Sequence, residues 1–154
     1  MDEASYRNHR AILEEELVCA LGCTEPIAVA YAAALARAAL GVEPESITSA
    51  CSGNIIKNVK SVTVPNSGGL RGIEAAATLG TIGGDATRAL EVLEAVSPAD
   101  IERSKELLAC GYCDVALVED VPNLYVRATA TAGGHTAVAC IEERPPNVTE
   151  LSRA

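Results

Sequence analysis

The stretch Gly22-Cys23-Thr24-Glu25-Pro26 leads directly into an alanine-rich run, Ile27 to Leu40, which ends at Gly41. Proline is favoured at the first position of a helix, where its missing N–H needs no partner, and threonine or glutamate before it can occupy the cap. The sequence therefore predicts a helix over residues 26–40. Because this run is apolar nearly all round, we expect the helix to be buried on several sides and the rest of the chain to pack around it.

The start of this helix gives Cys23 a distinctive environment. Cys23 lies three residues before Pro26, close to the unpaired backbone N–H groups and the positive end of the helix dipole. Both favour the thiolate over the thiol, and the thiolate is the form that acts as a nucleophile or metal ligand. The alternative is a small buried side chain beside an ordinary capped helix.

Length and composition indicate a single globular domain. The chain has 154 residues, of which 49% are hydrophobic and 21% charged, enough for one hydrophobic core. Its 12 basic and 21 acidic residues give a net charge of -9, which argues against a nucleic-acid partner. No apolar run reaches the roughly 18 residues that span a bilayer. The acidic start, Met1-Asp2-Glu3, is unlike a signal peptide, so we expect a cytoplasmic protein without a membrane partner.

The chain contains six cysteines. In a cytoplasmic protein these are better interpreted as free thiols, metal or cluster ligands, or redox groups than as disulfides. Cys110-Gly111-Tyr112-Cys113 is a Cys-x-x-Cys motif, but a predicted helix precedes it and a predicted strand follows, the reverse of the thioredoxin order. A structural zinc site would need a second pair of ligands, and none with comparable spacing is evident.

The order of predicted elements indicates an α+β fold. Helices are expected over residues 4–20, 26–40, 70–79, 86–95 and 98–109, with a short helical turn over 55–58. Strands are expected over residues 46–52, 59–65, 114–119, 124–132 and 136–142. Because helices and strands are segregated, we expect an antiparallel sheet packed on one face by several helices, its last three strands forming a meander. Residues 1–143 would form the domain and residues 144–154, which begin Arg144-Pro145-Pro146, a tail or linker.

Two glycine-containing segments are candidate ligand-binding loops. Ser52-Gly53-Asn54 precedes the short helical turn, and its glycine allows close approach of a ligand to the backbone. Asn66-Ser67-Gly68-Gly69 precedes another helix and leaves N–H groups available for an anion such as a substrate carboxylate. Purely structural turns are the alternative. His135 follows Gly133-Gly134 in a predicted hairpin and is either a surface turn residue or a catalytic one.

Three segments together resemble one protein family. They are Gly-Cys-Thr-Glu-Pro with its helix, Cys51-Ser52-Gly53-Asn54-Ile55-Ile56-Lys57-Asn58, and Pro65-Asn66-Ser67-Gly68-Gly69 leading into Gly72-Ile73-Glu74. From about Glu14 to His135 the chain resembles the N-terminal part of the L-cysteine desulfidase family, iron–sulfur lyases related to bacterial L-serine dehydratases. The resemblance implies elimination of hydrogen sulfide from L-cysteine, or of water from L-serine, to give pyruvate and ammonia.

The same resemblance implies a cofactor and a set of site residues. A 4Fe-4S cluster would be held by three cysteines, with one iron open to the substrate's leaving group. Cys23 would be one ligand, and the others would come from a C-terminal segment or subunit. The candidate substrate-binding residues are Thr24, Glu25, Ser52, Gly53, Asn54, Lys57, Asn58, Ser67, Gly68 and His135. Because the other ligands lie outside this chain, we expect it alone to have neither cluster nor turnover.

Two other functions are compatible with the sequence. One is a non-catalytic regulatory module that binds a small amino acid through the Ser52 and Ser67 loops. The other is a structural domain that forms a homo-oligomer through an exposed sheet edge.

Overall fold

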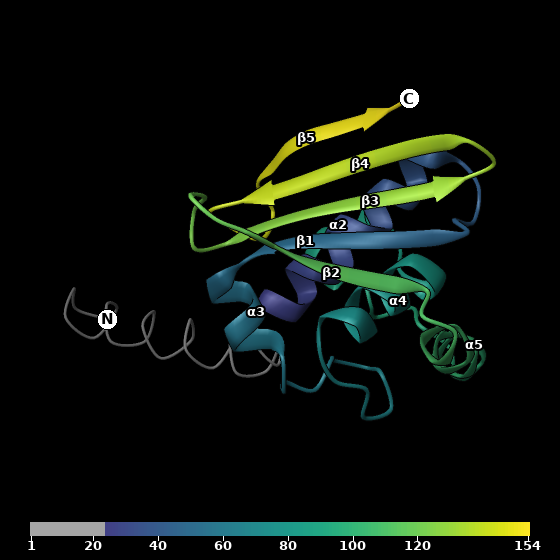
Figure 1. The fold of residues 1–154 in the computed structure, drawn as a ribbon. Coiled ribbons are helices and arrows are strands. Elements are labelled where there is room, and N and C mark those ends of the chain that lie inside the picture. The colour runs from purple at the N-terminus through teal and green to yellow at the C-terminus, as the bar shows by residue number, and fades with distance from the viewer. Residues whose placement is uncertain (1–23) are drawn as a thin grey trace, which may run out of the picture.

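The fold is a five-stranded sheet covered on one face by helices (Figure 1). The structure is a computed structural model and describes residues 24–154. The elements, in chain order, are α2 (Thr24–Leu40), β1 (Ser46–Ser52), α3 (Gly53–Val59), α4 (Ile73–Gly83), the 3-10 helix η1 (Ala86–Glu91), α5 (Pro98–Ala109), β2 (Cys113–Val118), β3 (Tyr125–Ala132), β4 (His135–Glu142) and β5 (Val148–Arg153). This arrangement confirms the α+β class. The helix expected over residues 4–20 lies outside the described residues, as does Cys23.

The sheet is mixed, with strand order β2-β1-β3-β4-β5. The pairs β1–β3, β3–β4 and β4–β5 are antiparallel, whereas β1 and β2 are parallel. Parallel strands need a long connection, and here it runs through α3, α4, η1 and α5. The expected hairpin between residues 114–119 and 124–132 is therefore wrong: β1 lies between them. Their connection passes the end of β1, where the Ser52 hydroxyl donates a hydrogen bond to the carbonyl of Asn123.

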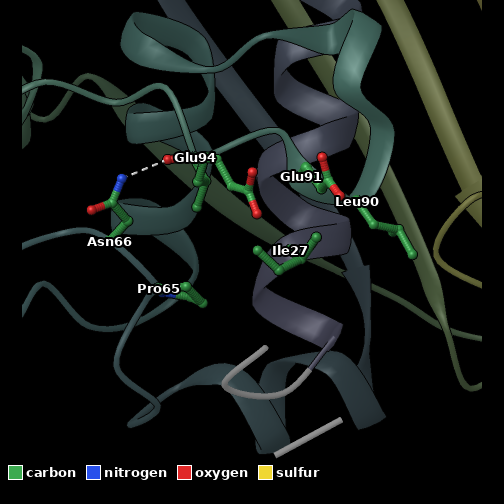
Figure 2. Close-up of a pocket in the computed structure, with 7 residues that line it drawn as sticks. Ile27, Pro65, Asn66, Leu90, Glu91 and Glu94 are labelled. Atoms are coloured by element: carbon green, nitrogen blue, oxygen red, sulfur yellow. Dashed lines mark hydrogen bonds between the residues drawn. The ribbon is translucent and has the colours of Figure 1, made fainter. Parts of the chain in front are cut away.

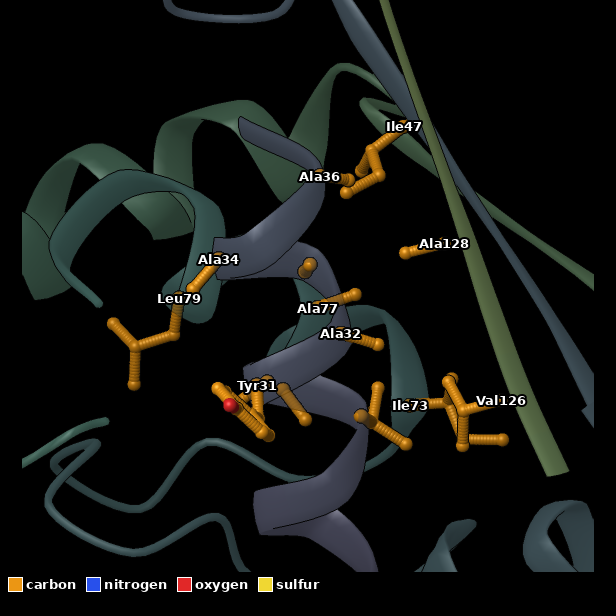
Figure 3. Packing of buried hydrophobic residues seen from close by; sticks show 14 of the residues in the cluster. Tyr31, Ala32, Ala34, Ala36, Ile47, Ile73, Ala77, Leu79, Val126 and Ala128 are labelled. Atoms are coloured by element: carbon orange, nitrogen blue, oxygen red, sulfur yellow. The ribbon is translucent and has the colours of Figure 1, made fainter. Parts of the chain in front are cut away.

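Helix α2 is the centre of the core. It packs against the sheet on one side and against α4 on the other, so most of its residues are buried, as expected. Figure 3 shows Ala32 and Ala36 on the side of the sheet residues Val126, Ala128 and Ile47. The small alanine side chains let all three layers approach closely, and the dispersion contacts that result stabilise the core.

The ends of the helices follow from local sequence. Helix α2 begins at Thr24, two residues earlier than expected, so Pro26 lies within the first turn, where a missing N–H is tolerated. Gly41 ends it with a φ of 84°, the left-handed conformation that favours glycine. Helix α5 begins with the predicted Ser97 cap, and Asp100 completes a capping box. Within residues 24–154, no helix is long and apolar enough to cross a membrane.

Three segments between α3 and α5 differ from expectation. Residues 59–65 are not a strand, because α3 continues to Val59 and only an isolated bridge joins Thr63 to Arg71. The helix expected over residues 86–95 is the shorter η1, which is interrupted at Ala89, where φ is 52°. The helix expected to start at Leu70 begins at Ile73, because residues 63–71 are taken up by the loop.

The expected tail, residues 144–154, contains strand β5. Pro145 and Pro146 form a turn and do not end the fold. After the turn, Ala154 and Thr136 exchange both backbone hydrogen bonds, at 3.1 and 2.7 Å, and Val148 packs against the core. The folded region thus extends through β5, the edge strand beside β4.

Candidate functional site

The amino end of α2 is joined to α3 by a side-chain hydrogen bond. Asn58 Nδ2 donates to Glu25 Oε1 over 3.2 Å, although 33 residues separate the two in sequence. Glu25 lies in the first turn of α2 and Asn58 near the end of α3. Two of the three segments singled out in the sequence therefore meet at this end of α2.

Ser52 holds α3 in place. Its side chain is 4% exposed, and its oxygen accepts a hydrogen bond of 3.3 Å from Ile55 N while its proton goes to the Asn123 carbonyl. This is the N-cap role expected for a serine before a short helix. Because the Ser52 hydroxyl makes both of these hydrogen bonds within the protein, its role is to position α3. The exposed residues of α3 include Gly53, Asn54 and Lys57.

Ser67 has a similar role in the loop from Pro65 to Gly69. Its side chain is 1% exposed, and its hydroxyl donates to the Val64 carbonyl over 2.6 Å and accepts from Leu70 N over 2.9 Å. Gly68 and Gly69 are exposed and have positive φ values of 69° and 98°, so the turn depends on glycine there. The conformation of the loop is therefore stabilised by the hydrogen bonds of the buried Ser67 side chain.

Asn66 ties this loop to the segment after η1. Its Nδ2 donates to the Leu93 carbonyl over 2.8 Å. A cavity of about 420 Å³ lies next to this contact. Its lining comes from α2, the loop, and the segment around η1: Ile27, Pro65, Asn66, Leu90, Glu91, Leu93 and Glu94. In Figure 2, Ile27 lies between the loop residues Pro65 and Asn66 on one side and Leu90 and Glu91 on the other.

This cavity combines an apolar floor with a polar rim. Ile27 and Leu93 are buried, whereas Asn66, Glu91 and Glu94 are exposed. Two carboxylates at one rim favour a cationic group, such as an ammonium, through their negative potential. Arg88 lies 3.7 Å from Glu94, but both side chains are about half exposed, so this ion pair is weak. The cavity has the size and mixed character of a small-molecule site.

His135 lies far from the other candidates. It begins β4 at the exposed hairpin beside Ala132, and the register pairs Thr131 with Ser46 at one end of β1 and Val126 with Cys51 at the other. Ser52 is therefore at the opposite end of β1 from this hairpin. At about 3.3 Å per residue, roughly 20 Å of strand separates them. The structure does not bring His135 to the amino end of α2.

The described cysteines are dispersed. Cys51, Cys113 and Cys140 are buried and Cys110 is exposed. Burial raises the pKa of Cys51 to about 11, opposed by the Ser49 hydrogen bond, and raises the pKa of Cys113 to about 12. Among residues 24–154, no group of three histidine, cysteine, aspartate or glutamate side chains is arranged to hold a metal ion. These residues alone do not fit an iron–sulfur cluster.

Comparison with known proteins gives relatives without a named activity. The chain is similar to UPF0597 proteins. It is 47% identical over 148 residues to one from Lachnoclostridium phytofermentans and 43% identical over 153 residues to one from Treponema denticola, covering 90% and 99% of this chain. A third, from Finegoldia magna, is 44% identical over 148 residues, or 96% of this chain. The match covers 36% of each relative's length. No family model and no solved structure matches the chain.

The structure thus brings together part of the set chosen from the sequence. Glu25 and Asn58 are in contact, and Asn66, next to Ser67, lines a cavity with Ile27 of α2. Thr24 is half-buried at the first residue of α2, and Cys23 precedes it. Sequence reasoning missed the carboxylates Glu91 and Glu94, because nothing in the pattern of η1 places them beside α2. The one polar cavity residue that the sequence could have indicated is Asn66, because it is adjacent to the candidate residues Ser67 and Gly68.

Proposed function

We propose that this chain is the substrate-binding part of a cytoplasmic iron–sulfur-dependent lyase. The reaction is elimination of hydrogen sulfide from L-cysteine, or of water from L-serine, to give pyruvate and ammonia. The main support is that the three segments resembling the L-cysteine desulfidase family are distant in sequence but close in the structure. Glu25 and Asn58 are hydrogen-bonded at the first turn of α2, and Asn66 lines the cavity beside this helix. A shared location is what a common substrate requires.

The cavity supplies groups for a small amino acid. In this proposal Glu91 and Glu94 bind the substrate's ammonium group, because carboxylates are its natural partners. The Asn66 amide, which lines the cavity, is the donor assigned to the substrate carboxylate. Lys57 and Gly68, the donors expected from the sequence, do not line it. The apolar floor formed by Ile27 and Leu93 excludes water from beneath the bound amino acid, which strengthens both interactions.

In this proposal Cys23 would be one ligand of the iron–sulfur cluster. Because residues 24–154 do not assemble a cluster site, the proposal requires ligands from a C-terminal segment or subunit in addition to Cys23. The cluster, when bound, supplies a Lewis acid for the leaving group. The described residues bind and orient the substrate, and the chain alone has no turnover.

A non-catalytic module that binds a small amino acid is the second candidate. One observation favours it: the cavity with its two carboxylates is formed within this chain alone. Such a module would bind L-cysteine or L-serine without iron and without producing pyruvate.

Anaerobic iron–sulfur reconstitution separates these functions. The chain would be mixed with the C-terminal part of a UPF0597 relative, and pyruvate and sulfide measured with L-cysteine and L-serine. The lyase predicts pyruvate that is lost in Cys23→Ala and retained in Cys110→Ala, a control at an exposed thiol. Amino-acid binding by calorimetry without iron uptake or pyruvate supports the module. Absence of both binding and turnover contradicts both functions.

A further inference from the structure

A second cavity, of about 310 Å³, lies between α3, the start of α4 and β2. Its lining residues are Ile56, Lys60, Gly72, Ile73, Glu74 and Val115, and none of them lines the cavity beside Ile27. The volume is at the lower end of the range for small-molecule sites. We propose that this second cavity binds a small α-amino acid with an aliphatic side chain.

Part of the cavity wall is aliphatic. Ile56 and Val115 are half-buried, and Ile73 is 3% exposed. Val115 is paired with the buried Ser49 of β1, so its side chain lies on the helix-covered face of the sheet, where α3 and α4 contact β2. Removing a ligand's aliphatic side chain from water against this surface is favourable, whereas a polar side chain would lose its hydration there.

The cavity lining also contains one positive and one negative side chain. Lys60 directly follows α3, and Glu74 lies in the first turn of α4. Within residues 24–154, these two side chains form no ion pair with each other or with any other side chain. Opposite charges that line one cavity without neutralising each other are complementary to a ligand that carries both charges, as an amino acid does.

The Glu74 carboxylate is close to β2. Cys113 of β2 is paired with the core residue Ile47, so its thiol lies on the helix-covered face. Burial is the main cause of the raised pKa of this thiol, and the negative charge of Glu74 raises the pKa further. In the proposed complex, Glu74 accepts hydrogen bonds from the ligand's ammonium group, and the Lys60 ammonium donates to the ligand's carboxylate.

The backbone brings the two charges to one cavity. The segment after α3 turns back on itself, so that Gly72 N donates to the Val62 carbonyl over 3.2 Å. Gly72 has a φ of 93°, and a Cβ atom there would lie 3.4 Å from the Lys60 carbonyl oxygen. Lys60 and Glu74 are therefore held at the two ends of one closed loop. The proposal does not depend on the lyase function, since the cavity beside Ile27 takes no part in it.

Titration of the isotope-labelled 154-residue chain with L-valine, followed by amide nuclear magnetic resonance shifts, tests the site. The largest shifts should fall on Gly72, Ile73 and Val115. At pH 7, L-valinamide lacks the carboxylate and isovalerate lacks the ammonium group. Each should therefore bind about tenfold more weakly than L-valine, because one charge-assisted interaction is lost.

Two neutral variants assign the charges separately. Lys60→Met should remove most of the preference for L-valine over L-valinamide, and Glu74→Gln most of the preference for L-valine over isovalerate. Each variant should keep the other preference, which a general loss of structure would not allow. Lys105→Met is the matched control: this exposed lysine of α5 lies outside the cavity, so the variant should bind L-valine as tightly as the unmodified chain.

Circular dichroism of each variant establishes that it is folded. A chain that does not bind L-valine overturns the proposal, as do equal affinities for L-valine and its two analogues. Shifts that fall on Ile27 and Asn66 while Ile73 does not move also overturn it. That last result would place the ligand in the other cavity and leave the proposed function intact, so the two proposals fail separately.

Discussion

Asn58 and Glu25 are joined by a hydrogen bond of 3.2 Å that connects α3 to the first turn of α2. The bond links the carboxyl-terminal part of α3 to the helix that follows Cys23. Within residues 24–154, no group donates to the second carboxylate oxygen of Glu25, which is buried. The Asn58 amide is therefore important for satisfying this carboxylate.

Replacing Asn58 should weaken the contact between α3 and α2. Asn58→Ala removes one hydrogen bond to a carboxylate at an exposed position, so we expect the free energy of unfolding to fall by about 1 kcal/mol. Urea denaturation measures this change. Asn54→Ala, at an exposed position on the same helix, should change stability by less than about 0.5 kcal/mol. Equal losses in the two variants would contradict the role of the Asn58–Glu25 bond.

The contact between α2 and α4 depends on Gly80. A Cβ atom at this position would overlap the backbone of Ala30, so Gly80→Ala should force the helices apart and destabilise the fold by about 3 kcal/mol. Thermal and urea unfolding measure the loss. Gly53→Ala is the matched control, since its Cβ would make an ordinary contact of 3.7 Å with Leu117. A Gly80→Ala protein as stable as Gly53→Ala would show that the helices are not this close.

The buried thiols should make the fold sensitive to alkaline pH. Burial raises the pKa of Cys51 from 9.0 to about 11 and that of Cys113 from 9.0 to about 12. Each raised pKa contributes stability that is fully present below pH 9, the ordinary thiol value, and is lost as pH rises through the folded value, because the unfolded state deprotonates first. The free energy of unfolding should therefore decline from about pH 9 upward.

Variants isolate the thiol contribution to this decline. Cys113→Ala should flatten the pH dependence above about pH 9 even though it lowers stability at neutral pH. Cys110→Ala, at the exposed thiol, should leave the slope unchanged. The account is contradicted if the Cys113→Ala slope equals that of the unmodified chain.

Thiol alkylation should follow exposure. Among the described cysteines, Cys110 is exposed while Cys51, Cys113 and Cys140 are buried, and alkylation requires an accessible thiolate. Iodoacetamide added to the folded protein should modify Cys110 first, and the three buried thiols only on unfolding. Peptide mass spectrometry measures each rate. Modification of Cys51 or Cys113 as fast as Cys110 would show that the core is open.

Local signals predicted the elements whose ends have strong capping residues. Helix α2 with Gly41, strand β1, and the Ser97 cap of α5 follow from nearby residues. The parallel pairing of β1 with β2 could not be predicted, because it joins strands that are separated by three α-helices and η1 and depends on tertiary packing. Strand β5 was missed because Pro145 and Pro146 mark a chain end as readily as a turn.

For the candidate site, too, the sequence predicts the segments involved but not the roles of their side chains. The segments around Glu25, Asn58 and Ser67 were recognised from their residues, but their side-chain roles were not. A sequence cannot distinguish a serine that binds a ligand from one that, like Ser67, closes its own loop. Glu91 and Glu94 reach the cavity only through the irregular path of η1.

We propose that the cavity at the amino end of α2 binds a small amino acid. Titration of the isotope-labelled chain with L-serine, followed by amide nuclear magnetic resonance shifts, tests it residue by residue. Glu94→Gln, which removes one rim carboxylate, should weaken the binding. If the amino acid binds in the cavity, the largest shifts fall on Ile27, Asn66 and Leu93. It is contradicted if these amides do not move, or if the largest shifts fall on the hairpin from Gly133 to His135.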